Sequence, residues 1–202
     1  AIYGDYGNYE KALEYYLRCL AIDERIGDPE YLATSLNNVA SKYRDLGEIE
    51  KSKEYHAKSL ALSMKEEDQS GISLSYNNLG YLYEQENDID SALYYYQMAL
   101  EIRQTMNDPD VLTSSQVNLG RVYLEVGKID EARELGEEAL KISQRSGFPD
   151  AIESAASLLW RVADKEGNVD RAYEMYLLKI KMRDSIDNID AREAAIQQRT
   201  RF

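Results

Sequence analysis

The stretch of residues 76–100, YNNLGYLYEQENDIDSALYYYQMAL, contains the pattern that decides the fold of this chain. Its apolar and small residues recur every three to four positions, which predicts two helices joined by a tight turn at Asn87. Gly80, Ala92 and Ala99 stand where the two helix backbones would approach closely, and large residues stand beside them. One helical hairpin cannot bury such a face alone, so the pattern predicts further hairpins stacked alongside it.

A turn residue recurs every 40 residues, with the same residue types at fixed distances from it. Glycine, and more rarely asparagine, suits a helix end at which the backbone passes through positive φ. Three residues later each copy carries an acid, which interacts favourably with the dipole at the start of the next helix. The turn residues are Gly7, Gly47, Asn87, Gly127 and Gly167, and the acids are Glu10, Glu50, Asp90, Asp130 and Asp170.

The joints between hairpins carry helix-start signals in the same register. Asp28-Pro29 and Asp108-Pro109 each place an N-cap acid before a proline at the first helical position. We therefore predict an all-α solenoid of about five hairpins over residues 1–187, the first one truncated, and a polar capping or exit helix within residues 188–202. The predicted helices span residues 8–26, 30–46, 48–67, 70–86, 88–107, 110–126, 128–146, 149–166 and 168–187, followed by 191–202 after a joint at 187–190.

Composition excludes several classes of function. The net charge of −13 argues against nucleic acid and anionic membranes as partners, because both favour basic surfaces. No apolar run approaches the roughly 18 residues that a membrane span needs, so we expect no direct membrane contact. With one histidine, His56, and one cysteine, Cys19, the sequence shows no catalytic triad, zinc site or disulfide. We expect no cofactor, no metal and no enzymatic activity, and buried packing roles for both residues.

The pattern L-G-x-x-Y, a turn, then A-x-x-x-Y-x-x-A resembles the tetratricopeptide repeat. A 40-residue period alone would equally fit HEAT or armadillo units, but the residue pattern favours the tetratricopeptide family. Its long-repeat members include kinesin light chains and bacterial peptide-sensing regulators. The resemblance implies a right-handed superhelix whose first helices line a concave groove, and a protein or peptide segment as the partner.

The last twenty residues resemble the segment that follows such repeats in bacterial membrane signalling proteins. This implies that the chain is the sensory or regulatory part of a longer, membrane-anchored protein and faces the periplasm; a cytoplasmic location is the alternative. A homodimer formed through the C-terminal helix is a further expectation. The alternative function is a structural scaffold or dimerisation module that uses convex or terminal surfaces.

The first helices carry the candidate binding residues. An asparagine stands nine residues before three successive turns, and a carboxamide can both donate to and accept from an extended peptide backbone. The alternative is that these amides bond to a neighbouring helix and tie the repeats together. Basic residues on the same face would suit an acidic group on the peptide. The predicted peptide-binding residues are Asn37, Asn38, Arg44, Asn77, Asn78, Tyr81, Asn118, Arg121 and Arg161.

The fourth and fifth copies depart from the pattern in a complementary way. Gly136 replaces a bulky residue, and Trp160 in the next copy replaces a small one. We predict that the indole of Trp160 fills the space left at Gly136.

Overall fold

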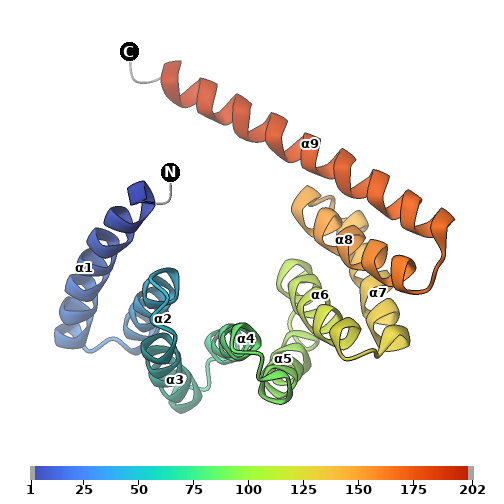
Figure 1. Ribbon diagram of the computed structural model, residues 1–202. Coiled ribbons are helices and arrows are strands. Elements are labelled where there is room, and N and C mark those ends of the chain that lie inside the picture. The colour runs from blue at the N-terminus through green and yellow to red at the C-terminus, as the bar shows by residue number, and fades with distance from the viewer. Residues whose placement is uncertain (1–2, 200–202) are drawn as a thin grey trace. The chain divides into compact units, whose positions relative to one another are not determined.

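The structure, a computed structural model, describes the backbone of residues 3–199 and the side chains of residues 9–188. Within these residues the chain forms nine α-helices and no strand (Figure 1). The helices are α1 (Tyr3–Ile26), α2 (Pro29–Asp45), α3 (Ile49–Lys65), α4 (Gln69–Gln85), α5 (Ile89–Arg103), α6 (Pro109–Glu125), α7 (Ile129–Ser146), α8 (Pro149–Lys165) and α9 (Val169–Arg199).

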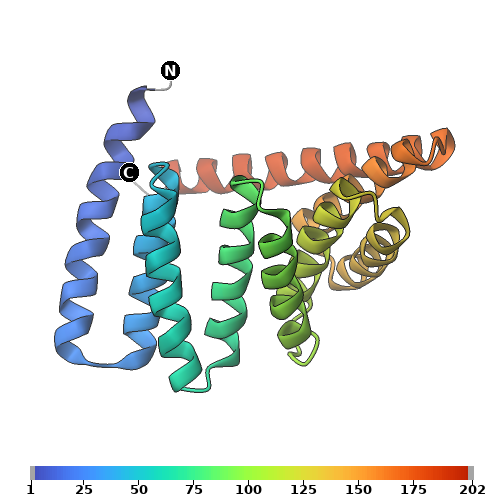
Figure 2. The same ribbon diagram turned by 60° about the horizontal axis from the view of Figure 1, so that its bottom comes forward.

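The chain divides into two compact units, Ala1–Arg103 with α1–α5 and Gln104–Phe202 with α6–α9. In each unit every helix packs on the next one in the chain, so the predicted all-α solenoid of helical hairpins is confirmed. Figure 2 shows α1 to α5 standing side by side in chain order. The first helices of successive hairpins also contact each other, α2 with α4 and α6 with α8.

The predicted hairpin turns are present at four of the five positions. Gly47, Asn87, Gly127 and Gly167 have φ of 78°, 61°, 80° and 70°, the left-handed conformation that ends a helix. The turn predicted at Gly7 is wrong, because α1 continues through that residue. Residues 3–6 extend α1 instead of turning back on it.

Close helix packing depends on the small residues of the pattern, as predicted. Ala92 and Ala99 of α5 are completely buried, and Tyr96 beside them is 1% exposed. A Cβ added at Gly80 of α4 would lie 2.8 Å from the Tyr96 ring. The glycine is therefore what allows the α4 backbone to approach that ring closely.

The prediction for Trp160 is wrong. A Cβ at Gly136 would meet Leu159, at 2.8 Å from Cδ2, so Leu159 and not the indole fills that space. Leu159 is 2% exposed and belongs to the core of the second unit. Trp160 lies one residue further around α8 and packs against Tyr176 of α9, with 5.9 Å between ring centroids. Successive helical residues point about 100° apart, which separates the two roles.

Cys19 also differs from expectation, because it is exposed. Its counterpart in the next hairpin, Ser59, is completely buried and donates from Oγ to the Ala33 carbonyl of α2 over 3.0 Å. This position on the second helix of a hairpin is thus covered by the first helix of the same hairpin. No such helix precedes α1 in the described residues, which leaves Cys19 open to solvent.

The predicted joint at residues 187–190 is not a break, because α9 runs through it without interruption. The segment Asp187-Asn188-Ile189-Asp190 contains neither proline nor glycine. Asn188 instead donates from Nδ2 to the Asp184 carbonyl over 2.7 Å, a contact that fits inside a helix. Of the predicted helix at 191–202, residues 200–202 lie outside the described residues, and the capping or exit role of residues 188–202 stays a prediction.

Candidate binding face

The first helices of successive hairpins form one face in each unit, α2 with α4 and α6 with α8, which we call the first-helix face. Among the described residues, this face carries hollows in both units. The large pocket, of about 750 Å³, lies between α2 and α4 in the first unit. Two smaller hollows, of about 160 Å³ and 180 Å³, lie between α6 and α8 in the second unit.

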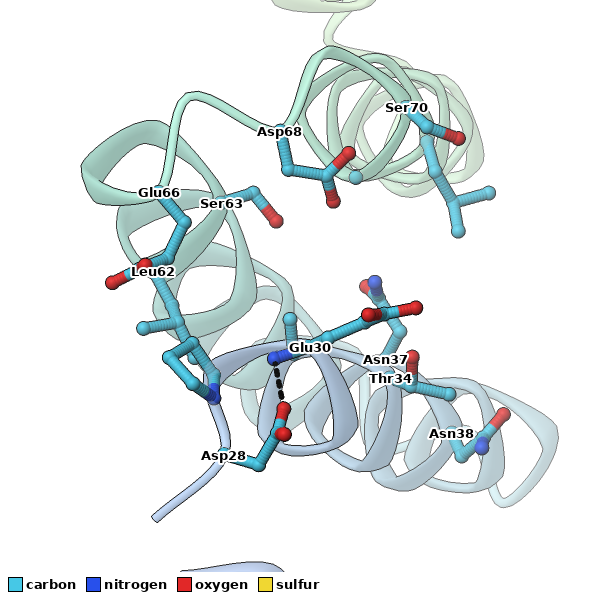
Figure 3. A pocket seen from close by; sticks show the side chains of 14 residues that line it. Asp28, Glu30, Thr34, Asn37, Asn38, Leu62, Ser63, Glu66, Asp68 and Ser70 are labelled. Carbon is cyan, nitrogen blue, oxygen red and sulfur yellow. Dashed lines mark hydrogen bonds between the residues drawn. The ribbon is translucent and has the colours of Figure 1, made fainter.

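The large pocket is built from the starts of two first helices and the end of α3 (Figure 3). One wall comes from α2, with Thr34, Asn37 and Asn38, and the other from α4, with Leu74. The joints before α2 and α4, the first turns of these two helices and the last turn of α3 close the end of the pocket. These parts contribute Asp28, Pro29, Leu62, Ser63, Glu66, Asp68, Ser70 and Gly71.

Asn37 is held inside its own hairpin. It is 8% exposed, and its Oδ1 lies 2.8 Å from Nδ1 of His56 on α3. Burial, together with the positive charge of Arg44, lowers the pKa of His56 to about 4. The imidazole is therefore neutral near pH 7, and with Nδ1–H donating to Asn37 its Nε2 has no partner within the described residues. His56 is completely buried, as its expected packing role requires.

Arg44 and Tyr81 are brought together across the first-helix face. The guanidinium carbon of Arg44 on α2 lies 5.6 Å from the ring centroid of Tyr81 on α4, a cation–π contact between neighbouring first helices. Nη2 of Arg44 also donates to Asp45 over 3.0 Å. Asn77 and Asn78 lie on α4, both half-buried. Arg44 and Tyr81, two of the predicted peptide-binding residues that are distant in sequence, thus meet on this face.

The remaining predicted residues line the smaller hollows of the second unit. Asn118 of α6 borders one of them. Arg121 of α6 and Arg161 of α8 both border the other, and Nη2 of Arg161 lies 3.9 Å from Glu125. The structure thus places one amide and two guanidinium groups beside open space between α6 and α8.

Sequence reasoning missed the closed end of the large pocket, formed by Ser63, Asp68 and Gly71. A signal was available in the register, because Gly71 stands where the other hairpins have Tyr31, Val111 and Ala151. A Cβ at Gly71 would collide with Oδ2 of Asp68 and Oγ of Ser63. Glycine at this position therefore leaves space at the closed end of the pocket that any other side chain would fill.

The described residues offer neither a membrane-spanning helix nor a metal-binding cluster. No helix among them is both long enough and apolar enough to cross a membrane. No group of three or more His, Cys, Asp or Glu side chains in that part of the chain is placed to hold a metal ion.

Comparison with known proteins points to one family. One model of the tetratricopeptide repeat matches residues 1–65 and 31–105, and a second model of this repeat matches residues 112–146. No curated protein sequence matches the chain significantly.

Three solved structures illustrate the similarity of fold. BtubC from P. vanneervenii is 24% identical, with a TM-score of 0.78 over 90% of this chain and 75% of its own. A STAND protein of Pyrococcus horikoshii with a tetratricopeptide repeat sensor is 21% identical, with a TM-score of 0.76 over 92% and 29%. A Rap protein complexed with Competence and Sporulation Factor is 22% identical, with a TM-score of 0.75 over 88% and 50%.

Proposed function

The chain belongs to the tetratricopeptide repeat family, and we propose that it binds an extended peptide or protein segment on the first-helix face. Proteins of this fold generally act as non-catalytic interaction scaffolds, so a protein-interaction role follows from the family. We propose further that this chain has no catalytic activity of its own and acts as the sensory or regulatory part of a larger signalling protein. The Rap protein complex and the STAND sensor support a regulatory role by analogy of fold.

The observation that carries the proposal is the position of the hollows. In both units they lie between consecutive first helices, and residues selected from the sequence pattern border them, Asn38 in one unit and Asn118, Arg121 and Arg161 in the other. A carboxamide there can donate to a peptide carbonyl and accept from a peptide N–H. Affinity would come from these backbone contacts, and specificity from side chains that enter the hollows.

The experiment begins with a binder selected from a phage-displayed library of random peptides against the full chain. Its dissociation constant is then measured by fluorescence anisotropy on wild type and on the double variant Asn38→Ala with Asn78→Ala. We expect at least about tenfold weaker binding, since two polar contacts of ordinary strength are lost, with an unchanged melting temperature. Asn118→Ala tests the second unit separately.

Asn188→Ala is the matched control, because it makes the same exchange at an exposed position of α9, a helix that does not belong to the first-helix face. It should leave affinity unchanged. A selection that yields no binder refutes the proposal. Retained binding together with a large loss of stability in the double variant would show instead that the amides tie helices together.

A second candidate function, assembly through the end of the solenoid, is favoured by the exposed face of α9. Val169 and Tyr173 are 76% and 65% exposed, and Tyr176 and Leu177 continue the same apolar strip along the helix. The counterparts of Tyr176 in earlier hairpins, His56 and Tyr96, are buried. Light scattering distinguishes the two functions. A dimer that Tyr173→Glu converts to a monomer supports assembly, and a wild-type monomer at all concentrations excludes self-assembly.

A further inference from the structure

Ser63 stands at a position of the repeat that takes very different side chains. It is 1% exposed, its Oγ has no hydrogen-bond partner in the described residues, and Figure 3 shows the hydroxyl pointing into the large pocket. Forty residues later, Arg103 is only 4% exposed and donates from Nε to Ser73 Oγ over 3.3 Å. Ser73 is the counterpart of Ala33, which lines the large pocket. At equivalent places, the hairpin α2–α3 therefore has an open pocket and the hairpin α4–α5 has a buried guanidinium.

The large pocket is also negatively charged. Every charged residue that lines it in the described part of the chain is an acid, Asp28, Glu30, Glu66 or Asp68. The carboxylate of Asp28 is already engaged, because its Oδ1 accepts from the backbone N–H of Glu30 over 3.0 Å and caps α2. Asp68 occupies the same N-cap position of α4 but caps nothing with its side chain. Its carboxylate faces the pocket instead (Figure 3) and can pair with a cation.

An organic cation fits this arrangement better than a metal ion. The acids come from separate elements around a cavity of about 750 Å³, and none of them belongs to a cluster that could hold a metal among the described residues. A guanidinium presents five N–H donors in a planar fork, which separate acceptors can satisfy together. Ser63 Oγ, the Asp68 carboxylate and the side-chain oxygens of Thr34 and Asn38 offer such acceptors.

We propose that the large pocket binds the guanidinium of an arginine side chain that belongs to the peptide segment. Asp68 supplies the charge partner, Ser63 accepts one N–H at the buried end of the pocket, and Gly71 leaves free the space beside both oxygens that a Cβ would fill. This inference rests on the proposed function, because it assigns one pocket of the first-helix face to one side chain of the bound segment.

The test uses the full 202-residue chain and two small probes, N-acetyl-arginine amide and its neutral isostere N-acetyl-citrulline amide. Binding is followed by NMR through the backbone amide signals of Gly71 and its neighbours. We expect saturable shifts with the arginine probe and at least about tenfold weaker binding of citrulline, which lacks the charge. Equal binding of the two probes, or no shift near Gly71 with either, overturns the proposal.

Three variants locate the binding. Asp68→Asn should weaken the arginine probe about tenfold or more. Asp90→Asn makes the same change of net charge at an exposed position of α5 and should leave affinity unchanged. Ser63→Arg should fill the pocket from within, as Arg103 does in the next hairpin, and abolish probe binding without lowering the melting temperature. Equal losses in the Asp68 and Asp90 variants would overturn the assignment of the site.

A third probe, free L-arginine, separates a peptide side chain from a small metabolite. Tenfold tighter binding of free arginine than of the capped probe overturns the peptide assignment. Failure of this inference remains distinguishable from failure of the proposed function. If selected peptides bind and depend on Asn38 and Asn78 while the arginine probe does not bind, only the pocket assignment falls. If the probe binds but the library yields no peptide, the peptide function is refuted together with the assignment to a peptide side chain, while the guanidinium site itself is retained.

Discussion

His56 allows the packing of the α2–α3 hairpin to be tested through pH. The chain has one histidine, so its imidazole signals in an NMR spectrum need no assignment against others. Burial, with Arg44 nearby, lowers the pKa of His56 from 6.5 to about 4 in the folded chain. Below pH 6.5 the unfolded chain therefore binds the proton first, and the free energy of unfolding falls as pH decreases toward 4.

The size of this effect follows from the two pKa values. One pKa unit corresponds to about 1.4 kcal/mol, so the full shift is worth about 3 kcal/mol and is lost completely only below pH 4. Between pH 7 and pH 5 the loss is about 2 kcal/mol, because only the unfolded chain is protonated in that range. Carboxylates titrate mainly below pH 5, so the change in stability between pH 7 and pH 5 reports mainly on His56.

The assay compares wild type with His56→Asn, which keeps an amide donor for Asn37 and removes the titration. Urea unfolding followed by circular dichroism gives the free energy of unfolding of both proteins at each pH. The stability difference between wild type and variant should shrink by about 2 kcal/mol from pH 7 to pH 5. A difference that is independent of pH, or an NMR titration of folded His56 with its midpoint at pH 6 or above, would refute the reasoning.

Three further predictions concern packing and exposure. Leu159→Ala should lower the free energy of unfolding by about 2–5 kcal/mol. Trp160→Ala should lower it by less, since the indole is only partly buried and packs against that core from outside. Urea titrations in which the order is reversed would contradict the packing at Gly136. Gly80→Ala should cost about 1–3 kcal/mol through its contact with the Tyr96 ring, despite the better helix propensity of alanine, and adding Tyr96→Leu should restore part of the loss. Cys19 should react with Ellman's reagent in the folded chain at nearly the rate found in urea, and strong protection would show that the residue is covered.

Most of the architecture could be predicted from one sequence because it is repeated. Each copy of the 40-residue pattern offers the same turn residue and the same small and large positions, so the copies support one interpretation together. The errors lie where a copy has lost its neighbours or its signals. In the described residues α1 runs through Gly7 without a first helix packed before it, and residues 187–190 lack the proline or glycine that would end a helix.

The candidate site was predictable in outline only. Asn38, Asn118 and Arg121, which were selected from the register, border hollows of the first-helix face, and their binding of a peptide stays a prediction. It could not show that Asn37 is engaged by His56, because adjacent helical residues point in different directions and their partners lie on another helix.

The sequence alone therefore determined the repeating unit, its turns and the helix face on which the candidate binding residues stand. These follow from local periodicity and backbone conformation, which are properties of neighbouring residues in the chain. Only the tertiary structure decided which pockets form between the first helices and which side chains line them. Three features form the end of the large pocket. The Asp68 side chain does not cap α4, the Ser63 hydroxyl has no hydrogen-bond partner in the described residues, and Gly71 has no side chain. The packing of α3 against α4 brings them together. Such a convergence depends on how helices pack against each other, and the spacing of residues within one helix does not encode it.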